Sequence, residues 1–229
     1  MKTNPFLYLV CLLYMTMYSS CKLEDDQTSN PHQNHKMAQF DPQANVGRSA
    51  WQKPQLIVNK LGDLSDKTVV DIGAGSGFFS FRFAIKAKKV IALDIDQDMI
   101  DIIKLQQNNL PSEINQKIET RLVKPDDPAL ESGEADKVVI INTITYIDNK
   151  ISYLKKIFDS QKPGDQILIV DFKKNTLPID APPITERMSA DETVKVLQQA
   201  GYEVVEKDEN TLEYQYIILA DKSTKASME

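Results

Sequence analysis

The sequence predicts an α/β protein built on a doubly wound sheet of seven mostly parallel strands, with an antiparallel last strand. Apolar runs rich in Val and Ile alternate with segments whose apolar residues recur at helical spacing. The runs are nearly continuously apolar, which is typical of a parallel sheet covered by helices on both faces. The last two runs, Glu203–Lys207 and Glu213–Leu219, are too close together for a crossover connection, so they are expected to pair antiparallel.

The remaining elements are expected to alternate along the chain. Strands are expected at Thr68–Ile72, Val90–Asp94, Ile118–Val123, Lys137–Ile141 and Gln166–Asp171. Helices are expected at Gln52–Leu61, Gly77–Lys86, Gln97–Asn108, Ile151–Gln161 and Ala190–Ala200. Ser189 and Glu192 have the spacing of a capping box for the last helix. With 229 residues, 41% of them hydrophobic, the chain is long enough for one such domain.

Residues 1–21 are expected to be a signal segment. Lys2 precedes the apolar stretch Phe6–Tyr18, which is shorter than the ~20 residues that a transmembrane helix needs. The ending Ser19-Ser20-Cys21 resembles the end of a bacterial lipobox, which implies lipidation of Cys21 and a membrane-anchored lipoprotein of the cell envelope. If the segment is not a working signal, the expected location is the cytoplasm.

Residues 22–40 are polar and are expected to form a flexible tether, followed by the folded domain at 41–220 and a tail at 221–229. The tether holds both histidines, His32 and His35, without a third metal ligand nearby, so no metal site is expected. A general base in the folded domain is therefore a carboxylate, a tyrosine or a lysine, unless the reaction needs no base. The net charge of −6 argues against nucleic acid as a partner.

The segment Val69–Gly77, VVDIGAGSG, is the most informative part of the chain for function. An apolar run that ends near Asp71 and leads into Gly73, Gly75 and Gly77 predicts a buried strand that turns into a helix. Glycine at alternate positions allows a sharp bend and lets a ligand lie against bare backbone. The expected ligand is a nucleotide-like cofactor.

The spacing of the glycines and a second acidic residue narrow the choice of cofactor. The dinucleotide pattern G-x-G-x-x-G places its third glycine where this chain has Phe78. The next apolar run ends in Asp94, a carboxylate at the position that accepts ribose hydroxyls. Asp94 suits NAD and S-adenosylmethionine equally, whereas the G-x-G-x-G spacing favours S-adenosylmethionine.

At these residues the chain resembles the class I S-adenosylmethionine-dependent methyltransferases, which have a Rossmann-like fold. The resemblance covers roughly residues 40–220 and is carried by Asp71-Ile-Gly73-Ala-Gly75-Ser-Gly77, Asp94, Arg48–Pro54, Lys162–Asp165 and Ala200–Tyr202. It implies that Asp71 and the glycine turn hold the methionine portion, Asp94 the ribose, and Ile95 and Asp127 the adenine. The cofactor-binding residues implied in this way are Asp71, Gly73, Ala74, Gly75, Gly77, Asp94, Ile95, Asp127 and Asn142.

The resemblance also implies in-line transfer of the sulfonium methyl group to a small-molecule acceptor. Asn142, which follows the fourth strand, is expected to face the methyl group, and Tyr146 to orient or deprotonate the nucleophile. These two are the candidate catalytic residues. Their segment lacks the NPPY signature of methylation on nucleic-acid bases. The loop Lys173–Met188 is expected to be either a substrate lid or a surface loop.

Two other interpretations stay open. Because S-adenosylmethionine is made in the cytosol, an exported chain with this fold is alternatively a membrane-anchored binding module without catalytic activity. A dinucleotide oxidoreductase is the third interpretation, which Phe78 disfavours. The sequence indicates neither the methyl acceptor nor the oligomeric state.

Overall fold

The structure is a computed structural model that describes residues 47–223. The expectations for the signal segment 1–21, for Cys21, for the tether 22–40 and for most of the tail 221–229 therefore concern residues outside the described part of the chain. Everything that follows refers to residues 47–223.

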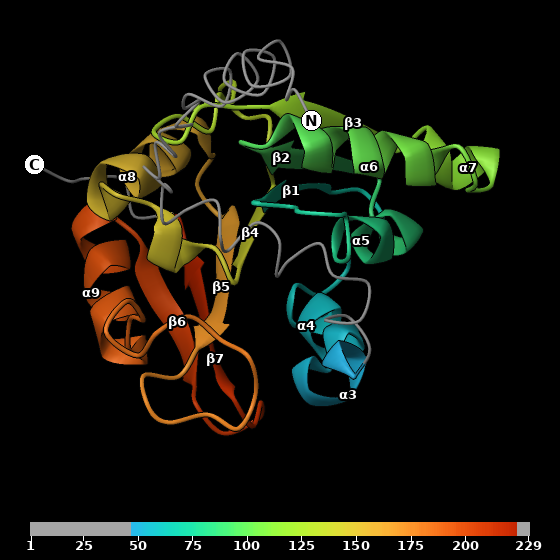
Figure 1. The fold of residues 1–229 in the computed structure, drawn as a ribbon. Helices are drawn as coiled ribbons and strands as arrows, with labels where there is room; N and C mark the ends of the chain where they lie inside the picture. The colour runs from blue at the N-terminus through green and yellow to red at the C-terminus, as the bar shows by residue number, and fades with distance from the viewer. Residues whose placement is uncertain (1–46, 224–229) are drawn as a thin grey trace, which may run out of the picture. The chain divides into compact units, whose positions relative to one another are not determined.

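Seven strands form one sheet in the order β3-β2-β1-β4-β5-β7-β6 (Figure 1). Their bounds are β1 (Thr68–Ile72), β2 (Lys89–Asp94), β3 (Ile118–Leu122), β4 (Lys137–Ile141), β5 (Gln166–Phe172), β6 (Glu203–Asp208) and β7 (Gln215–Asp221). β7 runs antiparallel to both of its neighbours, and the other neighbouring strands pair in parallel. The expected doubly wound, mostly parallel sheet with an antiparallel last strand is confirmed.

Helices pack on both faces of the sheet, with α8 and α9 on one face and α4, α5 and α6 on the other (Figure 1). Their bounds are α3 (Arg48–Gln52), α4 (Pro54–Lys60), α5 (Ser80–Lys86), α6 (Gln97–Gln107), α7 (Ser112–Asn115), α8 (Lys150–Ser160) and α9 (Ala190–Ala200), with a 3₁₀ turn, η1 (Ile144–Tyr146), after β4. The predicted capping box of α9 is present, since Ser189 and Glu192 exchange side-chain and backbone hydrogen bonds.

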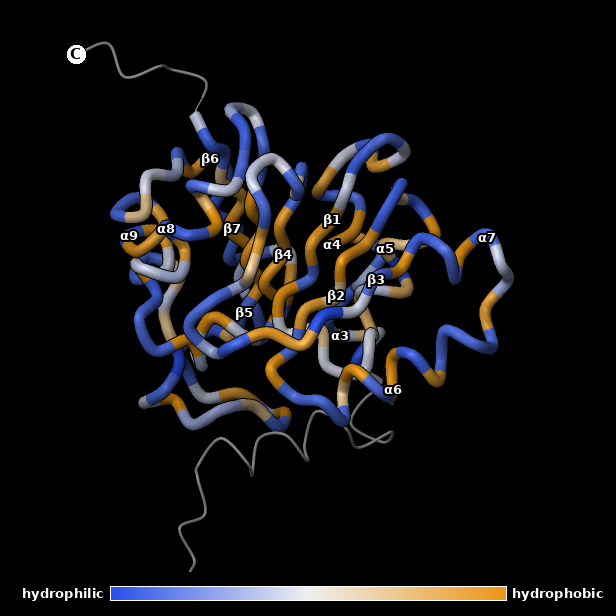
Figure 2. Tube along the Cα trace, turned by 90° about the horizontal axis from the view of Figure 1, so that it is seen from above, coloured by the Kyte–Doolittle hydropathy of each residue, from blue (hydrophilic) through white to orange (hydrophobic). Residues whose placement is uncertain are grey.

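The strands supply apolar side chains to two separate cores, because successive residues of a strand point to opposite faces of the sheet. On one face, Val138 and Ile140 of β4 lie in the same core as Leu154 of α8. On the other, Val139 and Ile141 lie in the same core as α4 and α5. Figure 2 shows the result as hydrophobic strands in the centre and mostly hydrophilic loops around them. Burial on both faces explains the continuous apolar runs of the sequence.

Two helices begin or break differently from the prediction, and both differences have a backbone cause. The expected helix Gln52–Leu61 is two helices, α3 and α4, because Lys53 adopts a left-handed conformation with φ 49°. The expected helix from Gly77 begins only at Ser80, since Gly77 is also left-handed, with φ 84°. The short helix α7 and the turn η1 were not predicted from the sequence.

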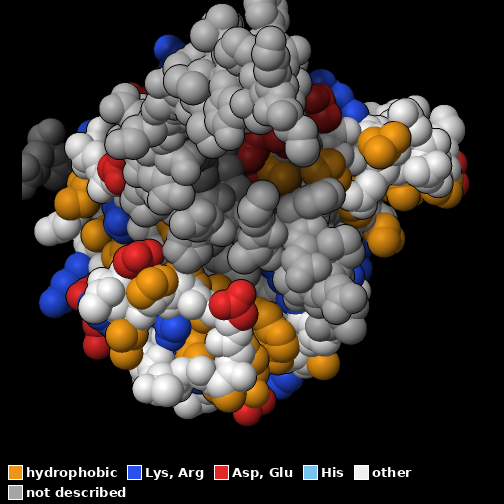
Figure 3. Space-filling view, in the orientation of Figure 1, with side chains coloured by type: hydrophobic (Ala, Val, Ile, Leu, Met, Phe, Trp, Pro, Cys, Tyr) orange, Lys and Arg blue, Asp and Glu red, His pale blue; other side chains and the backbone are white. Residues whose placement is uncertain are grey.

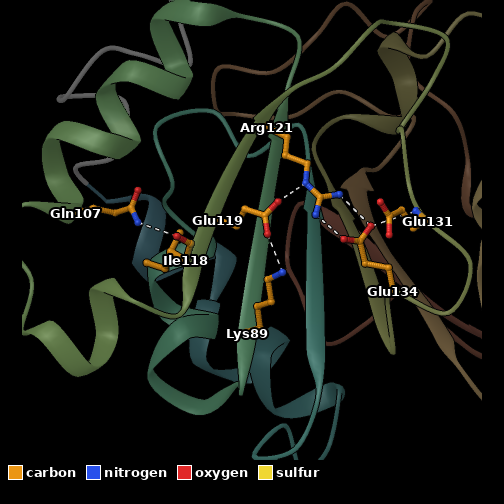
Figure 4. Close-up of polar contacts among 7 residues, drawn as sticks. All are labelled: Lys89, Gln107, Ile118, Glu119, Arg121, Glu131 and Glu134. Atoms are coloured by element: carbon orange, nitrogen blue, oxygen red, sulfur yellow. Dashed lines mark hydrogen bonds and ion pairs between the residues drawn. The ribbon is translucent and has the colours of Figure 1, made fainter.

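Edge strand β3 carries a network of charged side chains (Figure 4). Glu119 pairs with Lys89 of β2 at 2.7 Å and with Arg121, which in turn binds the carboxylate of Glu134. From the other side, Gln107 of α6 donates to the Ile118 carbonyl at 2.9 Å. Charged side chains on an edge strand discourage pairing with another chain. The network also anchors the strand that leads into one wall of the cavity described below.

The turn after β1 depends on glycine at position 77 for space as well as for backbone conformation. A Cβ atom at Gly77 would lie 2.6 Å from the Phe81 ring and 3.2 Å from Ile103. Gly62 has a similar φ of 74°, but a Cβ atom there would meet nothing within 4 Å. Alanine substitutions at these two glycines therefore separate the free-energy cost of a left-handed alanine from that of a steric clash.

We expect Gly77→Ala to lower the free energy of unfolding more than Gly62→Ala does. The left-handed backbone costs about 1–2 kcal/mol in both variants, and the clash adds about 1–3 kcal/mol at position 77 alone. Urea denaturation of both variants measures the difference. Equal losses for the two variants contradict the role of the close packing against Phe81 and Ile103.

Candidate functional site

The site lies at the carboxyl ends of β1 and β4, where the strand order reverses direction. β2 and β3 extend the sheet from one side of β1, and β4 and β5 from the other. In doubly wound sheets, ligands bind in the crevice at this point. The loops after β1, β2 and β4 meet here, and they contain most of the residues predicted from the sequence.

The glycine turn after β1 is fixed by hydrogen bonds to the end of β2. The backbone amides of Gly73 and Ala74 both donate to the Leu93 carbonyl at 2.9 Å. Gly73, Gly75 and Gly77 all have positive φ, at 70°, 55° and 84°. The turn therefore uses the backbone freedom of glycine at each of its three alternate positions.

Gly73 also lies against the loop after β4. A Cβ atom at position 73 would lie 2.5 Å from Oγ1 and Cγ2 of Thr143. Only glycine allows the two loops to approach this closely. Gly77 has another task, because it packs against Phe81 and Ile103. Neither of the two cavities described below is lined by Gly77.

Asp94 binds the glycine turn through its side chain. Its Oδ2 accepts a hydrogen bond from the Gly75 amide at 2.8 Å, and its Oδ1 accepts one from the Asp96 amide at 3.0 Å. These bonds fix the orientation of the carboxylate. Asp94 is buried, and burial raises its pKa above the ordinary value. Each carboxylate oxygen has acceptor capacity for more than one donor, so further hydrogen bonds can form here.

A cavity of about 120 Å³ opens beside Asp94. Its walls are mainly apolar and include Leu93, Val123 and Ile147. Ile95, 49% exposed, also lines it, so the structure places this predicted residue at the cavity. Tyr146 of η1 lies on the same cavity. Burial and the nearby carboxylate of Asp171 raise the pKa of Tyr146.

A second, smaller cavity of about 40 Å³ adjoins the first, since Gly73 lines both. Its lining contains a cation, Arg48, and an anion, Asp71, together with Asn142. The backbone of Ala74 and Gly75 completes it. The structure thus brings Asp71, the glycine turn and Asn142 together, as the sequence predicted, and adds Arg48.

The two charged groups of the smaller cavity are held by different neighbours. Asp71 is buried, accepts a hydrogen bond from Ser80 Oγ at 2.6 Å, and has its pKa raised to about 6, chiefly by burial. Arg48 lies over the Phe78 ring, with 4.4 Å between the guanidinium carbon and the ring centroid. Burial lowers the pKa of Arg48 to about 10, and the charge of Asp71 opposes that shift. Both groups are therefore charged above pH 6 and below pH 10.

Asn142 is held by two glutamines that are distant in sequence. Gln52 of α3 and Gln215 of β7 both donate to Asn142 Oδ1, the first at 3.4 Å. Asn142 itself is left-handed, with φ 59°, a conformation that asparagine adopts more readily than most residues. Helix α3 is further fixed by Trp51, whose ring lies 5.9 Å from that of Phe172 and 6.0 Å from that of Tyr214.

Asp127, like Gly77, is a predicted site residue that the structure does not bring to either cavity. Its side chain caps the Ala129 amide at 3.0 Å and lies 3.8 Å from Lys156. A backbone bridge between Lys124 and Asp127 turns the chain away after β3. The cavity wall at this end comes from Val123 and Pro125 instead.

The sequence analysis missed Arg48, Gln52 and Gln215 as site residues. Arg48 and Gln52 lie in the segment Arg48–Pro54, which had been noted for its resemblance alone. Gln215 is an amide in an otherwise apolar strand and is fully buried. A buried amide needs hydrogen-bond partners, which was the available signal. Its partner Gln52 is 163 residues away along the chain.

The loop between β5 and α9 carries apolar side chains interspersed with acidic and basic ones (Figure 3). Arg187 fastens this loop by donating to the backbone carbonyls of Pro182 and Asn175, at 2.5 and 2.8 Å. Within residues 47–223, no helix combines the length and apolarity needed to cross a membrane, and no group of three or more metal-ligating side chains occurs.

A family model and several known proteins match this chain. A family model described as a methyltransferase domain matches residues 63–220. The demethylmenaquinone methyltransferase of Lactococcus lactis is 28% identical over 125 residues, which are 53% of this chain and 48% of that protein. The ubiquinone biosynthesis O-methyltransferase of Dechloromonas aromatica is 26% identical over 119 residues, which are 52% of this chain and 50% of that protein. The chain thus spans about half the length of these relatives.

Solved structures share the fold. A structure described as an S-adenosylmethionine-dependent methyltransferase from Aquifex aeolicus superimposes with a TM-score of 0.72 at 22% identity, over 82% of this chain and 96% of that one. This likeness confirms the expected fold class. The family match covers well over half of the chain and confirms the expected family. The chain belongs to the methyltransferase domain family.

Proposed function

We propose that this chain is an S-adenosylmethionine-dependent methyltransferase that acts on a small-molecule acceptor. The observation that carries the proposal is the pair of adjoining cavities at the glycine turn. One is apolar with a carboxylate, and the other holds a cation and an anion. S-adenosylmethionine joins a nucleoside to an α-amino acid, and the two cavities match these two halves. The family match supports the same cofactor.

The larger cavity suits the nucleoside. A carboxylate at the end of the second strand accepts ribose hydroxyls in related folds, and Asp94 is held for that role by the amides of Gly75 and Asp96. The apolar side chains Leu93, Ile95 and Val123 offer surfaces for the adenine ring. Asp127 is not needed to complete this arrangement, although it was expected to contact the adenine.

The smaller cavity suits the amino-acid half. The guanidinium of Arg48 matches the carboxylate, and the carboxylate of Asp71 matches the ammonium group. The backbone of Gly73 and Gly75 leaves room for the ligand to lie close to the main chain. Opposite charges held in one small cavity bind a zwitterion better than they bind a single charge.

The cofactor supplies an already activated methyl group, so the chain's task is to place the acceptor in line with it. Asn142 lines the smaller cavity and Tyr146 the larger one, and Thr143 between them lines the larger cavity as well. A tyrosine is protonated at neutral pH and can serve as a hydrogen-bond donor, and the raised pKa of Tyr146 makes loss of its proton harder still. This assigns Tyr146 to orientation of the acceptor, and not to its deprotonation.

The names of the relatives support a small molecule as the acceptor. They refer to demethylmenaquinone and to ubiquinone biosynthesis. The formal charge of −6 disfavours an anionic polymer such as RNA or DNA. A screen of small molecules with cofactor labelled in its methyl group identifies the acceptor directly.

Calorimetric titration of the full-length chain with S-adenosylhomocysteine tests the cofactor site. We expect binding in the micromolar range or tighter, and a loss of about tenfold or more in Asp94→Ala, because the ribose loses its charged acceptor. Asp98→Ala is the matched control, since Asp98 is an exposed carboxylate in the first turn of α6, the helix that follows Asp94 in the chain. Unchanged affinity in Asp94→Ala contradicts the ribose assignment, and no binding by the wild type contradicts the proposed function.

Binding of S-adenosylhomocysteine is expected to depend on pH through Asp71. Only the ionised carboxylate attracts the ammonium group, and the pKa of Asp71 is raised to about 6. Affinity is therefore nearly constant between about pH 7 and pH 8 and falls as the pH decreases, by about fivefold between pH 6 and pH 5. Asp71→Asn is expected to bind more weakly at pH 7 and to show a flatter profile. Identical profiles for both proteins refute this role of Asp71.

We further propose that Cys21 carries a lipid anchor that places the chain at the cell envelope. The support is the apolar stretch Phe6–Tyr18 followed by Ser19-Ser20-Cys21. Metabolic labelling with palmitate in a bacterial host is expected to mark the wild type and not Cys21→Ser. Equal labelling of both, or labelling of neither, refutes the anchor.

A further inference from the structure

Four polar side chains form a continuous hydrogen-bonded chain from Arg48 to Asn142. Arg48 Nε donates to Gln52 Oε1 at 2.6 Å, and Gln52 Nε2 donates to Gln215 Oε1 at 2.9 Å. Gln215 Nε2 then donates to Asn142 Oδ1. The residues come from α3, from the start of β7 and from the loop after β4. The two ends of this chain line the smaller cavity, while the two glutamines do not.

The two glutamines are unusual for their positions. Both have no exposed surface, and burial of an amide is unfavourable unless its polar atoms form hydrogen bonds. Each glutamine uses both its oxygen and its nitrogen inside this chain of bonds. An apolar side chain at position 215 would pack against the buried residues of the sheet without needing hydrogen-bond partners. Packing alone therefore does not explain the amide of Gln215.

The direction of all these bonds is determined by Arg48. A guanidinium group only donates, so the oxygen of Gln52 has to face Arg48 and its nitrogen has to face Gln215. For the same reason Gln215 turns its oxygen to Gln52 and its nitrogen to Asn142. Asn142 therefore turns its oxygen inward, where it accepts from both glutamines.

The nitrogen of Asn142 is left as the group available to the cavity. Among the described residues, Nδ2 of Asn142 has no hydrogen-bond partner. The oxygen and nitrogen of an asparagine amide are nearly equal in size, so packing alone does not choose between the two orientations. The hydrogen-bonded chain makes that choice. Asn142 and Arg48 then present donors to the same small cavity.

We propose that Gln52 and Gln215 are positioning residues that hold the Asn142 amide with its nitrogen toward the cavity, so that Asn142 and Arg48 together bind the carboxylate of the amino-acid half of the ligand. The inference rests on the proposed function, because the carboxylate belongs to the cofactor. It assigns part of the cofactor site to β7, the last strand of the chain. Neither glutamine touches the ligand itself.

The substitution Gln215→Glu tests the proposal because it reverses one bond and keeps the shape. A glutamate at this position accepts from Gln52 as before, but it cannot donate to Asn142. Asn142 then turns its nitrogen inward and its oxygen toward the cavity, where it opposes a carboxylate. We expect affinity for S-adenosylhomocysteine, measured by calorimetry on the full-length chain, to fall about tenfold or more.

The comparison ligand is 5′-methylthioadenosine, which has the nucleoside but lacks the amino-acid group. We expect Gln215→Glu to bind it within about twofold of the wild-type affinity, because the larger cavity is unchanged. This ligand also reports whether the variant is folded. Gln215→Met, which removes the donor without adding a charge, is expected to show the same split to a smaller degree. Gln55→Glu is the matched control, since Gln55 is exposed and bonds only with Asn59.

The outcomes separate the inference from the proposed function. A parallel loss of both ligands in Gln215→Glu and Gln215→Met means that Gln215 supports the fold in general, and overturns the inference. Unchanged affinity for S-adenosylhomocysteine in both variants overturns it as well. If the wild type binds 5′-methylthioadenosine and not S-adenosylhomocysteine, the proposed function fails first, because the smaller cavity then does not take the amino-acid group.

Discussion

The hydrogen bond from the Gly75 amide to Asp94 Oδ2, at 2.8 Å, is the interaction on which the site depends. It joins the turn after β1 to the end of β2 and fixes the direction of the Asp94 carboxylate in the larger cavity. The bonds from Gly73 and Ala74 to the Leu93 carbonyl act at the same junction. A backbone of this shape needs left-handed residues at alternate positions, and glycine meets that need without strain. The G-x-G-x-G spacing in the sequence reflects this requirement for left-handed residues.

The same junction places buried charges next to one another. Asp71 and Asp94 are both nearly inaccessible, and burial raises the pKa of each; the charge of Asp94 raises the pKa of Asp71 further. Ionised buried groups destabilise the native state unless they are paired. Arg48 offsets part of this cost, since its charge lowers the pKa of Asp71. A zwitterionic ligand with a ribose would offset more of it, because it supplies an ammonium group and hydroxyl donors where the protein has carboxylates.

Sequence reasoning succeeded where structure follows from local pattern. The bounds of β1 and β4 and the capping box of α9 were predicted because apolar runs and caps are determined by adjacent residues. It failed where the chain turns for tertiary reasons. Lys53 breaks the expected first helix; Pro54 signals a boundary there, since a residue before proline avoids the helical conformation, but the left-handed conformation of Lys53 itself is not specified locally. Asp127 was assigned by its position after a strand, but the bridge to Lys124 and the contact with Lys156 direct it elsewhere.

The polar residues that the sequence analysis missed share one property. Gln52 and Gln215 contact each other across 163 positions, and each has a function only through the other. A single sequence offers no signal for such a pair beyond the presence of an amide in an apolar strand. Arg48 is similar, since its position over the Phe78 ring follows from the docking of α3 by Trp51. Local pattern therefore located the cofactor turn, while the residues that complete the site became visible only in three dimensions.

At the end of the larger cavity that Tyr146 lines, few side chains can accept or donate a proton near neutral pH. The described domain has no histidine, because both histidines of the chain lie before it. A tyrosine is protonated at neutral pH, and burial together with the nearby carboxylate of Asp171 raises the pKa of Tyr146 further. Asp171 itself is buried, and its Oδ2 is the one buried side-chain polar atom without a hydrogen-bond partner within residues 47–223. Burial raises the pKa of Asp171 to about 7, so this carboxyl is partly protonated near neutral pH. In the proposed reaction, the cofactor presents its activated methyl group on one side and Tyr146 a hydrogen-bond donor on the other. Under that proposal this end of the larger cavity orients the nucleophile, and placement in line with the methyl group supplies most of what the reaction requires.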